Sequence, residues 1–338
     1  MHDARTEMQS DITIYYILTE SCNCSCEFCI RQNMQIEKHM ELTQALFYLN
    51  KLNDFYKDSS IVLTGGEPFL YPNIECVISE SLKLFRNVAI TTNGSFSKKN
   101  ADMLKTYLAR GLKIQFSMDG TKDVHNKIRG KDAYEKLINN ISYLSQYSQS
   151  FSISTTVTKG NIENILFLAK ELNKVPFKFW KVSQEQLTDP CIDKLIDNSL
   201  WNSMVDKLVV ISRKPVIVSK YFDFQLFDKF KDFAEQHERD IVRNCGFGLR
   251  KLYVSPNFDI SPRSCTDIIV GNLNQNDLKT IYKRLNSLSD FSIKEDSVCI
   301  KCKYLNLCHG GCPGYSLKVF GEFGKGDIRC PYVKEKVQ

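Results

Sequence analysis

The stretch Cys22-Asn23-Cys24-Ser25-Cys26-Glu27-Phe28-Cys29 places three cysteines, Cys22, Cys26 and Cys29, with the spacing C-x3-C-x2-C. It follows an apolar run that predicts a buried strand. Cysteine thiolates hold iron–sulfur clusters because soft sulfur suits them. Three thiolates can hold three irons of a 4Fe–4S cube and leave the fourth iron open to a small molecule. The spacing therefore predicts a cluster with one open position.

Disulfide and zinc are the alternatives for this loop. A disulfide would require an oxidising compartment. A closed zinc site takes four ligands, and no fourth Cys or His lies at finger spacing near the loop.

The loop resembles the signature of the radical S-adenosylmethionine (SAM) enzymes, in which an aromatic residue such as Phe28 precedes the last cysteine. Cys24 breaks that spacing, and we interpret it as a bystander. The resemblance implies that Cys22, Cys26 and Cys29 hold a 4Fe–4S cluster and that SAM binds the open iron.

Composition narrows the class of protein. The 338 residues are 43% hydrophobic, which is enough for one large core or two domains. The formal charge is +6 without a basic block, so we expect no nucleic-acid partner. No apolar run reaches a membrane span and Met1–Ser10 has no signal region, so we expect a cytoplasmic protein that binds no membrane. Thirteen cysteines in such a protein indicate metal rather than disulfides.

Short apolar strands alternate with amphipathic helical stretches from residue 11 to about residue 183. The predicted strands are Ile12–Leu18, Ile61–Thr64, Val88–Thr92, Leu112–Met118, Phe151–Val157 and Phe177–Val182. The predicted helices are Leu42–Phe55, Ile74–Phe85, Lys98–Ala109, Tyr134–Tyr147, Ile162–Leu172 and Leu200–Ile211. This alternation predicts an α/β fold with a parallel sheet and right-handed crossovers. The pattern does not separate a barrel from a doubly wound sheet, but the family resemblance implies a partial (β/α)6 TIM barrel.

The chain after residue 213 changes character. We expect residues 1–213 to form the barrel, 214–244 a connector packed on it, and 245–338 a small cysteine-rich domain. That domain is predicted to contain a hairpin over Leu249–Ser264 and a helix over Asp277–Leu288. Residues 299–330 are predicted to be nearly all loop, and such a segment needs metal binding to supply folding energy.

Four motifs near predicted strand ends match the family's SAM-binding pattern. They are Gly65-Gly66-Glu67, Thr91-Thr92-Asn93-Gly94, Phe116-Ser117-Met118-Asp119-Gly120 and His125-Asn126-Lys127-Ile128-Arg129-Gly130. Glycines let a backbone approach closely, and Glu67 can accept hydrogen bonds from an ammonium group. The resemblance implies SAM binding by Phe28, Gly65, Gly66, Glu67, Asn93, Ser117, Asp119 and Arg129.

Within this set, the resemblance places Ser117 at the ribose hydroxyls and Arg129 at the SAM carboxylate, which an arginine can pair bidentately. Asn93 as a turn residue and Arg129 as a surface ion-pair partner remain open alternatives. We expect His125 to be structural rather than catalytic.

A second group of cysteines lies near the C-terminus. Cys299, Cys302, Cys308 and Cys312 run C-x2-C-x5-C-x3-C, followed by Cys330 and preceded by Cys245 and Cys265. The set resembles the SPASM extension of radical SAM enzymes, which carries two auxiliary 4Fe–4S clusters and would bring the total to three. A pair of zinc sites is the alternative.

The resemblance assigns Cys299, Cys302, Cys308 and Cys330 to one auxiliary cluster and Cys245, Cys265 and Cys312 to the other. The second cluster then lacks a fourth cysteine. Asp, water or the substrate peptide could fill that position, and Cys191 is a remote candidate. Ile260 stands where the family usually has glycine.

By resemblance, the reduced cluster cleaves SAM to a 5′-deoxyadenosyl radical, which abstracts hydrogen from a substrate. Relatives with this extension act mostly on peptides or proteins. We favour an intramolecular cross-link in a ribosomal precursor peptide, with a carbon–carbon cyclophane ahead of a thioether.

Two other functions stay open. Anaerobic sulfatase maturation, which forms formylglycine, is less favoured because Thr266 stands where those enzymes have an Asp base, and Asp267 is only a weak base candidate. A non-catalytic iron–sulfur electron carrier needs no SAM pocket, so the motifs at successive strand ends argue against it.

The first predicted strand begins near residue 11, which leaves no room for an N-terminal leader-binding domain. We expect a separate leader-binding protein, or the barrel with residues 214–244, to hold any leader. The expected partners are the precursor peptide and an electron donor such as a flavodoxin or ferredoxin.

Overall fold

One curved sheet organises the computed structural model, which describes residues 12–31, 38–187, 189–236, 248, 250–263, 265–289 and 292–337. The strand order in this part of the chain is β10-β9-β8-β1-β2-β3-β4-β5-β6-β7. The strands are β1 Thr13–Ile17, β2 Ser60–Thr64, β3 Asn87–Thr92, β4 Lys113–Ser117, β5 Phe151–Val157, β6 Phe179–Gln184, β7 Val216–Ile217, β8 Lys251–Val254, β9 Asp259–Ser261 and β10 Gly271–Asn272.

Neighbouring strands from β8 through β1 to β7 pair in parallel, and β9 and β10 add antiparallel pairs at one edge. The parallel α/β sheet that the sequence predicts is therefore confirmed. The predicted strands agree with β1 to β6 to within two residues at each end. The short β7 extends the sheet beyond the six predicted strands.

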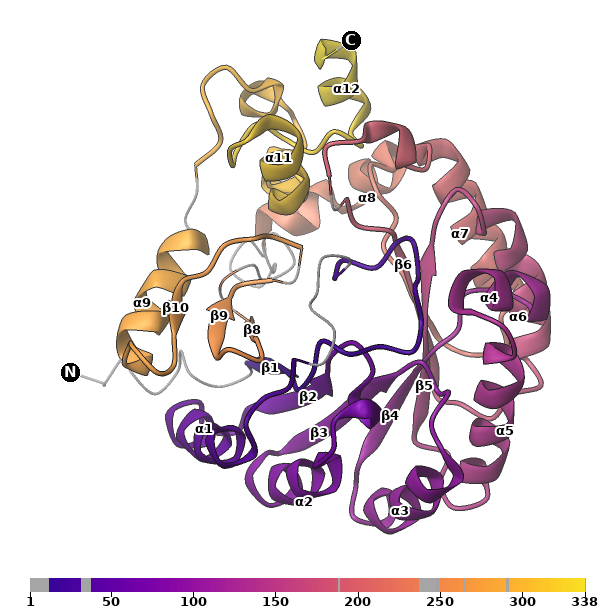
Figure 1. Ribbon diagram of the computed structural model, residues 1–338. Coiled ribbons are helices and arrows are strands. Elements are labelled where there is room, and N and C mark those ends of the chain that lie inside the picture. The colour runs from indigo at the N-terminus through magenta and orange to yellow at the C-terminus, as the bar shows by residue number, and fades with distance from the viewer. Residues whose placement is uncertain are drawn as a thin grey trace.

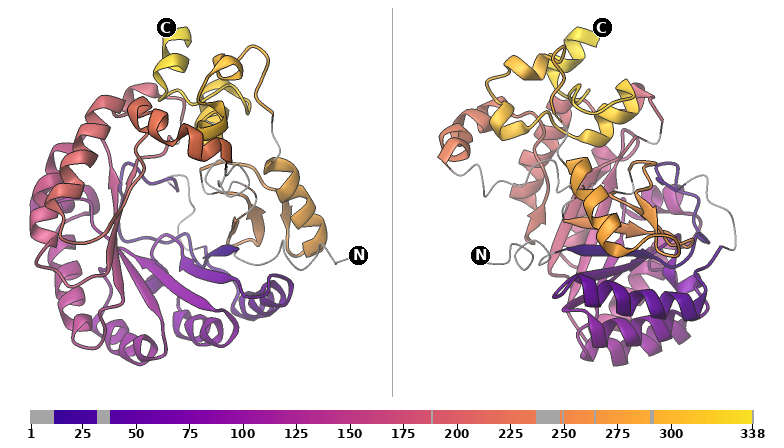
Figure 2. Two further views of the ribbon diagram at one scale, coloured as in Figure 1. Left: turned by 180° about the vertical axis from the view of Figure 1, so that it is seen from behind. Right: turned by 90° about the vertical axis from the view of Figure 1, so that its left-hand side faces the viewer.

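Helices cover the outer face of the arc that the sheet forms (Figures 1 and 2). They are α1 Leu42–Phe55, α2 Ile74–Leu84, α3 Lys98–Ala109, α4 Lys122–Arg129, α5 Ala133–Ser145, α6 Ile165–Leu172 and α7 Asn198–Ile211. Each longer helix buries one apolar stripe, as an amphipathic helix on a sheet must. In α1 this stripe consists of Ala45, Tyr48, Leu49 and Leu52, and the Glu41 side chain caps the first turn.

The two faces of the sheet carry different residues. One register row lies under the helices and is at most 1% exposed; it consists of Tyr16, Leu63, Ile90, Ile114 and Phe151. Another row faces the interior of the arc and is half-buried and polar; it consists of Ser117, Ser154 and Lys181. The interior of the barrel therefore offers polar groups at the end of the sheet where β4 ends.

The hairpin predicted over Leu249–Ser264 is confirmed by the antiparallel pair of β8 and β9. Because β8 also pairs with β1, the sheet continues into the cysteine-rich region. The helix predicted after Asp277 is α9, Leu278–Ser289, and the Asp277 carboxylate accepts a hydrogen bond from Thr280 N at 2.9 Å. The boundaries 1–213, 214–244 and 245–338 stay predictions.

The prediction that residues 299–330 are nearly all loop is wrong. The region contains η5 Val298–Lys301, α10 Leu305–Cys308 and α11 Pro313–Phe320, and α12 Pro331–Val337 follows it. Proline at the first position of α11 and the left-handed Gly321 after its end are the usual start and stop of a helix. The sequence pattern did not reveal these helices because each is at most eight residues long, too short to show a helical period.

The aromatic segment at 221–227 leads into α8, Phe224–Gln236. Together with residues of this segment, Cys299, Cys330 and Val333 form a small apolar cluster separate from the main core. The segment thus packs on the C-terminal cysteines, which the sequence pattern alone did not indicate. No helix in the described ranges is long and apolar enough to cross a membrane.

Candidate active site and cysteine pockets

The cysteine loop follows β1 and is held against the turn that follows β2. Gly66 N donates to Thr19 O and Glu67 N donates to Ser21 O, both at 2.8 Å. A Cβ at Gly65 would lie 2.6 Å from Thr19 O, and one at Gly66 would lie 2.2 Å from Ser21 O. Only glycine therefore allows this turn to reach the segment that leads into the cysteines.

The three predicted cluster ligands line one open cavity of about 820 Å³. Cys22, Cys26 and Cys29 share its wall with Phe28 and Arg129. Other lining residues are Glu20, Ser21, Cys24, Ser25, Glu27, Arg31, His39, Gly66 and Leu70. The structure thus brings together the predicted cysteines, the aromatic residue of the loop and a distant arginine, beside space for a ligand of SAM's size.

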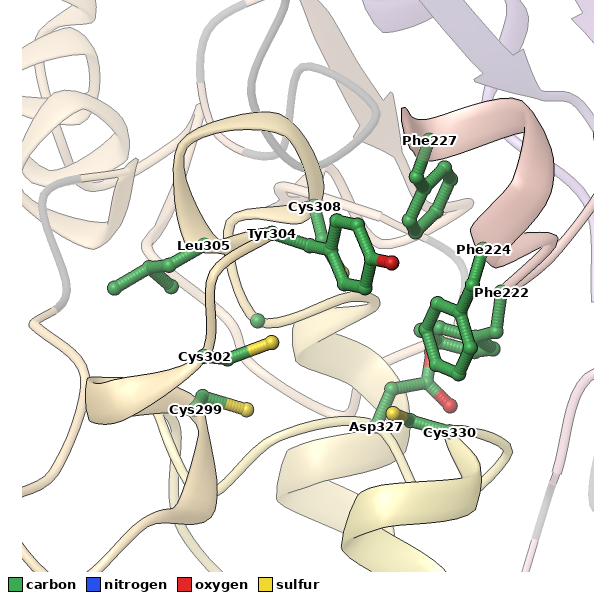
Figure 3. Close-up of a pocket in the computed structure, with 11 residues that line it drawn as sticks. Phe222, Phe224, Phe227, Cys299, Cys302, Tyr304, Leu305, Cys308, Asp327 and Cys330 are labelled. Atoms are coloured by element: carbon green, nitrogen blue, oxygen red, sulfur yellow. The ribbon is translucent and has the colours of Figure 1, made fainter. Parts of the chain in front are cut away.

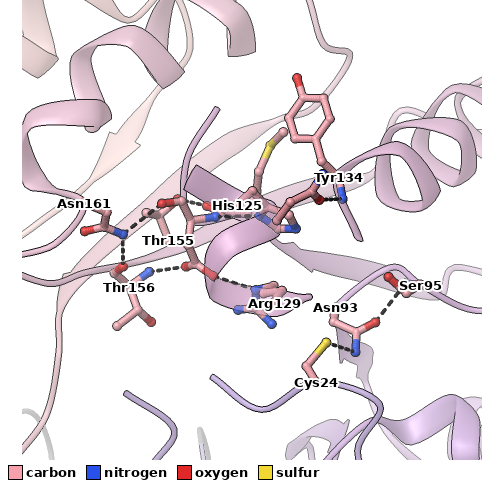
Figure 4. Close-up of polar contacts among 12 residues, drawn as sticks. Cys24, Asn93, Ser95, His125, Arg129, Tyr134, Thr155, Thr156 and Asn161 are labelled. Carbon is pink, nitrogen blue, oxygen red and sulfur yellow. Dashed lines mark hydrogen bonds and ion pairs between the residues drawn. The ribbon is translucent and has the colours of Figure 1, made fainter. Parts of the chain in front are cut away.

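A buried carboxylate positions that arginine (Figure 4). Arg129 Nε donates to Asp119 Oδ2 at 2.6 Å, and Asp119 Oδ1 accepts from Thr156 N at 2.8 Å. The Arg129 side chain is 11% exposed, so it is not a surface ion-pair partner. Its guanidinium carbon lies 5.9 Å from the centre of the Phe28 ring, within cation–π range.

His125 has a structural place, as expected. It is buried in α4, and its Nδ1 accepts a hydrogen bond from Asp119 N at 3.2 Å. Burial lowers the pKa of His125 to about 4, so the imidazole is neutral near pH 7. The neutral ring thus fixes the backbone of Asp119, and the Asp119 side chain in turn pairs with Arg129.

Glu67 joins the ends of β2 and β3. Its buried carboxylate accepts from Thr92 Oγ1 at 2.7 Å and from Asn93 N at 2.8 Å. Burial raises the pKa of Glu67 to about 7, and the hydrogen bond from Asn93 N opposes that rise. Both carboxylate oxygens are thus engaged by the chain itself, so an ammonium group would have to share them.

Asn93 reaches from the end of β3 to the cysteine loop. Its Nδ2 donates to Asn23 Oδ1 at 2.6 Å and lies 3.2 Å from Cys24 Sγ, while its Oδ1 accepts from Ser95 N at 2.8 Å. The side chain therefore acts both as a turn residue and as a tether of the loop. Ser117, the last residue of β4, is half-buried on the inner face of the sheet.

The thiols of the loop differ in their electrostatics. A hydrogen bond from the Cys24 side chain lowers the pKa of Cys22 to about 6 and also lowers that of Cys26. The same contacts, first with Cys22, raise the pKa of Cys24. Burial raises the pKa of Cys29. In this arrangement Cys24 is the donor to the other two thiols, and its role as a bystander stays a prediction.

Arg31 is a cavity residue that the sequence motifs did not identify. It is half-buried, it lines the same cavity, and its Nη1 donates to Gly65 O. It thereby ties the residue after the cysteines to the glycine turn. The sequence feature that could have identified it is an arginine two residues after Cys29.

Asp267, the weak base candidate, lies at the surface. Its side chain is 92% exposed and pairs with Lys318 Nζ at 2.5 Å. This placement gives no support to a base within a water-excluded site.

Four C-terminal cysteines line one pocket (Figure 3). They are Cys299, Cys302, Cys308 and Cys330. Phe222, Phe224, Phe227 and Tyr304 line the same pocket, with Phe224 and Tyr304 stacked at 5.0 Å. A Cβ at Gly326 would lie 2.9 Å from Cys299 Sγ, so this position must be small. Four sulfurs around a space kept clear of side chains fit a fully cysteine-ligated cluster.

A second C-terminal pocket holds Cys265 and Cys312 together with Gln186, Leu187, Gly314 and Tyr315. A Cβ at Gly314 would lie 3.2 Å from Cys265 Sγ and 3.6 Å from Cys312 Sγ. Both sulfurs therefore border one point that a side chain at 314 would fill. Cys245, the third predicted ligand, lies outside the described residues.

Asp327 and Arg329 lie between these two pockets. Asp327 lines the four-cysteine pocket, and its Oδ2 accepts from Cys312 N at 2.9 Å and from Arg329 Nη2 at 2.6 Å. The Arg329 guanidinium is held between the rings of Tyr221 and Tyr315, 4.0 and 3.9 Å from their centres. Sequence analysis missed both residues, although an Asp-x-Arg directly before Cys330 was visible.

Among the described residues, no three His, Cys, Asp or Glu side chains are arranged to hold a single metal ion. The assignment of these cysteines to clusters therefore stays a prediction.

Residues 16–172 match the profile of the Radical SAM superfamily. The chain is 23% identical to the subtilosin biosynthesis protein AlbA of Bacillus subtilis, over 87% of this chain and 65% of that protein. It is 23% identical to the AdoMet-dependent heme synthase of Methanosarcina barkeri, over 94% of this chain and 96% of the relative. It is 22% identical to the cysteine-type anaerobic sulfatase-maturating enzyme of Clostridium novyi, over 87% of this chain and 85% of the relative.

Two solved structures share the fold. SuiB of Streptococcus suis, solved with S-adenosylmethionine, has a TM-score of 0.76 at 18% identity, over 96% of this chain and 78% of that chain. SuiB has also been solved with a precursor peptide, SuiA. The structure of anSMEcpe with AdoMet has a TM-score of 0.73 at 16% identity, over 96% of this chain and 95% of that chain.

Proposed function

Because residues 16–172 form a radical SAM domain, we propose that this protein is a peptide-modifying radical SAM enzyme. It forms an intramolecular cross-link in a ribosomally made precursor peptide. As the type of cross-link, we favour a carbon–carbon cyclophane bond over a thioether. The observation that carries the proposal is the cavity in which Cys22, Cys26 and Cys29 meet Phe28 and Arg129.

Cys22, Cys26 and Cys29 would hold a 4Fe–4S cluster whose open iron takes the amino and carboxylate groups of SAM. When bound, the reduced cluster and SAM supply a 5′-deoxyadenosyl radical that abstracts hydrogen from the substrate. Arg129 is suited to pair with the SAM carboxylate, because only its Nε is engaged by Asp119 among the described residues. Phe28 borders the same space.

Two auxiliary 4Fe–4S clusters complete the proposed cofactor set. Cys299, Cys302, Cys308 and Cys330 would hold one, and Cys265 and Cys312 would contribute to the other, together with Cys245. The two pockets are joined through Asp327, which borders the first and accepts a hydrogen bond from Cys312 N in the second. Such a pair of clusters can take the electron that the product radical gives up and pass it to a flavodoxin-like or ferredoxin-like partner.

A peptide substrate is supported by similar proteins: AlbA is a bacteriocin biosynthesis protein, and SuiB has been solved bound to a precursor peptide. The inner face of the barrel is polar at Ser117, Ser154 and Lys181, where a peptide backbone would find hydrogen-bond partners. A separate leader-binding protein remains part of the proposal.

Sulfatase maturation is the runner-up, because a sulfatase-maturating enzyme is among the relatives. The exposed position of Asp267 does not favour it. A pure electron carrier is disfavoured by the cavity of about 820 Å³ beside the first three cysteines, since electron transfer needs no such space.

The test is anaerobic reconstitution with SAM and dithionite, followed by mass spectrometry for 5′-deoxyadenosine, and co-expression with a short peptide encoded beside this gene. We expect SAM cleavage and a peptide that loses two hydrogens with altered fragmentation. No cleavage under any reductant would contradict the enzyme, and cleavage with every peptide unchanged would contradict the substrate class.

A further inference from the structure

Gln186 carries a buried acceptor without a donor. It follows β6 by two residues and lines the pocket of Cys265 and Cys312. Its Oε1 is buried and has no hydrogen-bond partner among the described residues. An acceptor left in this state costs about 1–3 kcal/mol. A buried acceptor of this kind therefore calls for a donor group, a water or a metal.

The backbone that carries Gln186 is fixed from two sides. Glu185 N donates to Val157 O at 2.9 Å, which extends the pairing of β5 with β6 by one residue. Glu185 O accepts from Tyr315 Oη at 2.7 Å, and Tyr315 lines the same pocket as Gln186. The amide is thus held where the barrel meets α11, rather than on a loose loop.

The same pocket is lined by Cys265 and Cys312, two of the three cysteines that the sequence assigns to the auxiliary cluster without a fourth cysteine. Cys191, the remote candidate for that position, is exposed and is not among the residues that line the pocket. The pocket wall consists of two thiols, an amide, a leucine, a glycine and a tyrosine. Tyr315 Oη donates to a backbone carbonyl, so the Gln186 oxygen is the side-chain acceptor that stays available there.

We propose that Gln186 Oε1 is a protein donor, beside the thiolates of Cys265 and Cys312, to the iron–sulfur cluster of this pocket. The inference rests on the auxiliary clusters of the proposed function. A neutral amide oxygen is a harder and weaker donor to iron than a thiolate. The iron that it caps is therefore exchangeable, and a soft incoming ligand such as a substrate thiolate displaces the amide.

Cyanide binding to the reconstituted full chain tests this. Saturating SAM fills the open iron of the first cluster, so that added cyanide reports on the auxiliary cluster in the EPR spectrum of the reduced protein. Gln186→Ala is expected to bind cyanide about tenfold more tightly than wild type, which corresponds to about 1.4 kcal/mol. Gln186→Cys is expected to lose the cyanide-dependent signal, because a thiolate then closes the site.

Gln146→Ala is the matched control, since Gln146 is exposed at the end of α5 and is expected to titrate like wild type. Equal cyanide affinity in wild type, Gln186→Ala and Gln186→Cys would overturn the proposal and would indicate water or another ligand at this iron. If Gln186→Ala loses the cluster, iron analysis still decides: recovery of iron in Gln186→Cys supports the donor role, and loss in both variants overturns it.

Iron and sulfide analysis of Cys265→Ala separates this inference from the proposed function. A loss of one cluster's iron shows that the auxiliary cluster exists, and the cyanide titration then judges Gln186 alone. An iron content equal to that of wild type would show that Cys265 holds no cluster, and it would contradict the proposed cofactor set.

Discussion

Two buried arginine–aspartate pairs lie in opposite surroundings. Arg129 pairs with Asp119 and Arg329 with Asp327, each at 2.6 Å. Arg129 borders an open cavity and has one aromatic ring near it, whereas Arg329 is 5% exposed and has a tyrosine on each face. The same ion pair thus presents a cation to a ligand in the first region and locks two pockets together in the second.

The cysteines of the two regions follow the same division. In the open region a neighbouring thiol lowers the pKa of Cys22 to about 6. In the closed region burial raises the pKa of Cys308 to about 12 and of Cys330 to about 11. Three cysteines beside a cavity suit the proposed binding and turnover of a small molecule, and four cysteines under aromatic side chains suit the proposed retention of a cluster.

The largest effect is expected at Cys26. Cys26→Ala removes one of three thiolates and should abolish 5′-deoxyadenosine formation, measured by mass spectrometry. Cys24→Ala is the matched control and should keep cleavage, because we interpret Cys24 as a bystander of the loop. Equal loss in both variants would show that Cys24 is a ligand.

Removing a ligand of the closed region should have a different outcome. Cys302→Ala is expected to keep SAM cleavage but lose the modified peptide, because the product radical then lacks its electron acceptor. Both products are measured in one anaerobic assay. If Cys302→Ala still yields cross-linked peptide at the wild-type ratio to 5′-deoxyadenosine, the closed region is not the electron acceptor that we propose.

The two arginines should differ in ligand binding rather than in stability. Arg129→Met and Arg329→Met each leave a buried carboxylate unpaired and should lower the free energy of unfolding by about 3–5 kcal/mol. Only Arg129→Met should weaken SAM binding, by about 1.5–3 kcal/mol, the contribution of a charged hydrogen bond. Calorimetry on protein shown to be folded by circular dichroism measures this, and an equal loss of SAM affinity in Arg329→Met would contradict it.

The open region should also carry a pH dependence of stability. The folded-state pKa of Glu67 is raised from 4.5 to about 7, so the folded state holds a proton that the unfolded chain releases. Its stabilisation is complete below pH 4.5 and is lost as pH rises to 7, on the order of 3 kcal/mol in total. His125 acts oppositely, because its pKa is lowered to about 4 and stability rises with pH up to its ordinary value of 6.5.

Urea unfolding between pH 5 and pH 8 tests the Glu67 contribution. The opposing contributions of Glu67 and His125 should leave the wild-type stability nearly constant between pH 5 and 6.5. Glu67→Gln leaves the His125 contribution alone, so its stability should rise by about 2 kcal/mol over this interval. Glu80→Gln, at the ion pair with Lys83, should keep the wild-type profile. A Glu67→Gln profile equal to that of wild type would assign the pH dependence to other groups.

The smallest effect is expected at Asp267, which lies outside both regions. Asp267→Asn removes an exposed ion pair and should change the free energy of unfolding by less than about 1 kcal/mol. Peptide modification should continue at the wild-type rate in a timed assay. Loss of modified peptide with intact SAM cleavage would instead establish Asp267 as the base of the sulfatase-maturase type.

Much of the barrel could be predicted because its signals are local. Each strand is a short apolar run and each long helix has its own apolar period, so α1 and α3 have the predicted bounds. The helix α4 was not predicted, because its eight residues are mostly polar and only His125 is buried. The helices near Cys308 and Cys312 were not predicted either, since their apolar residues are few and pack on α8, which is distant in the sequence.

The sequence by itself determined the strand and helix order, the two cysteine spacings and the motifs at the strand ends, because these depend on neighbours along the chain. Only the tertiary structure decided that Arg129 borders the cavity, that Asp327 and Arg329 lie between two pockets, and that Gln186 lines one pocket with Cys265 and Cys312. These placements depend on how the sheet curves and on which distant segments pack over it. Burial at each place then shifts the protonation state of a side chain and limits its hydrogen-bond partners.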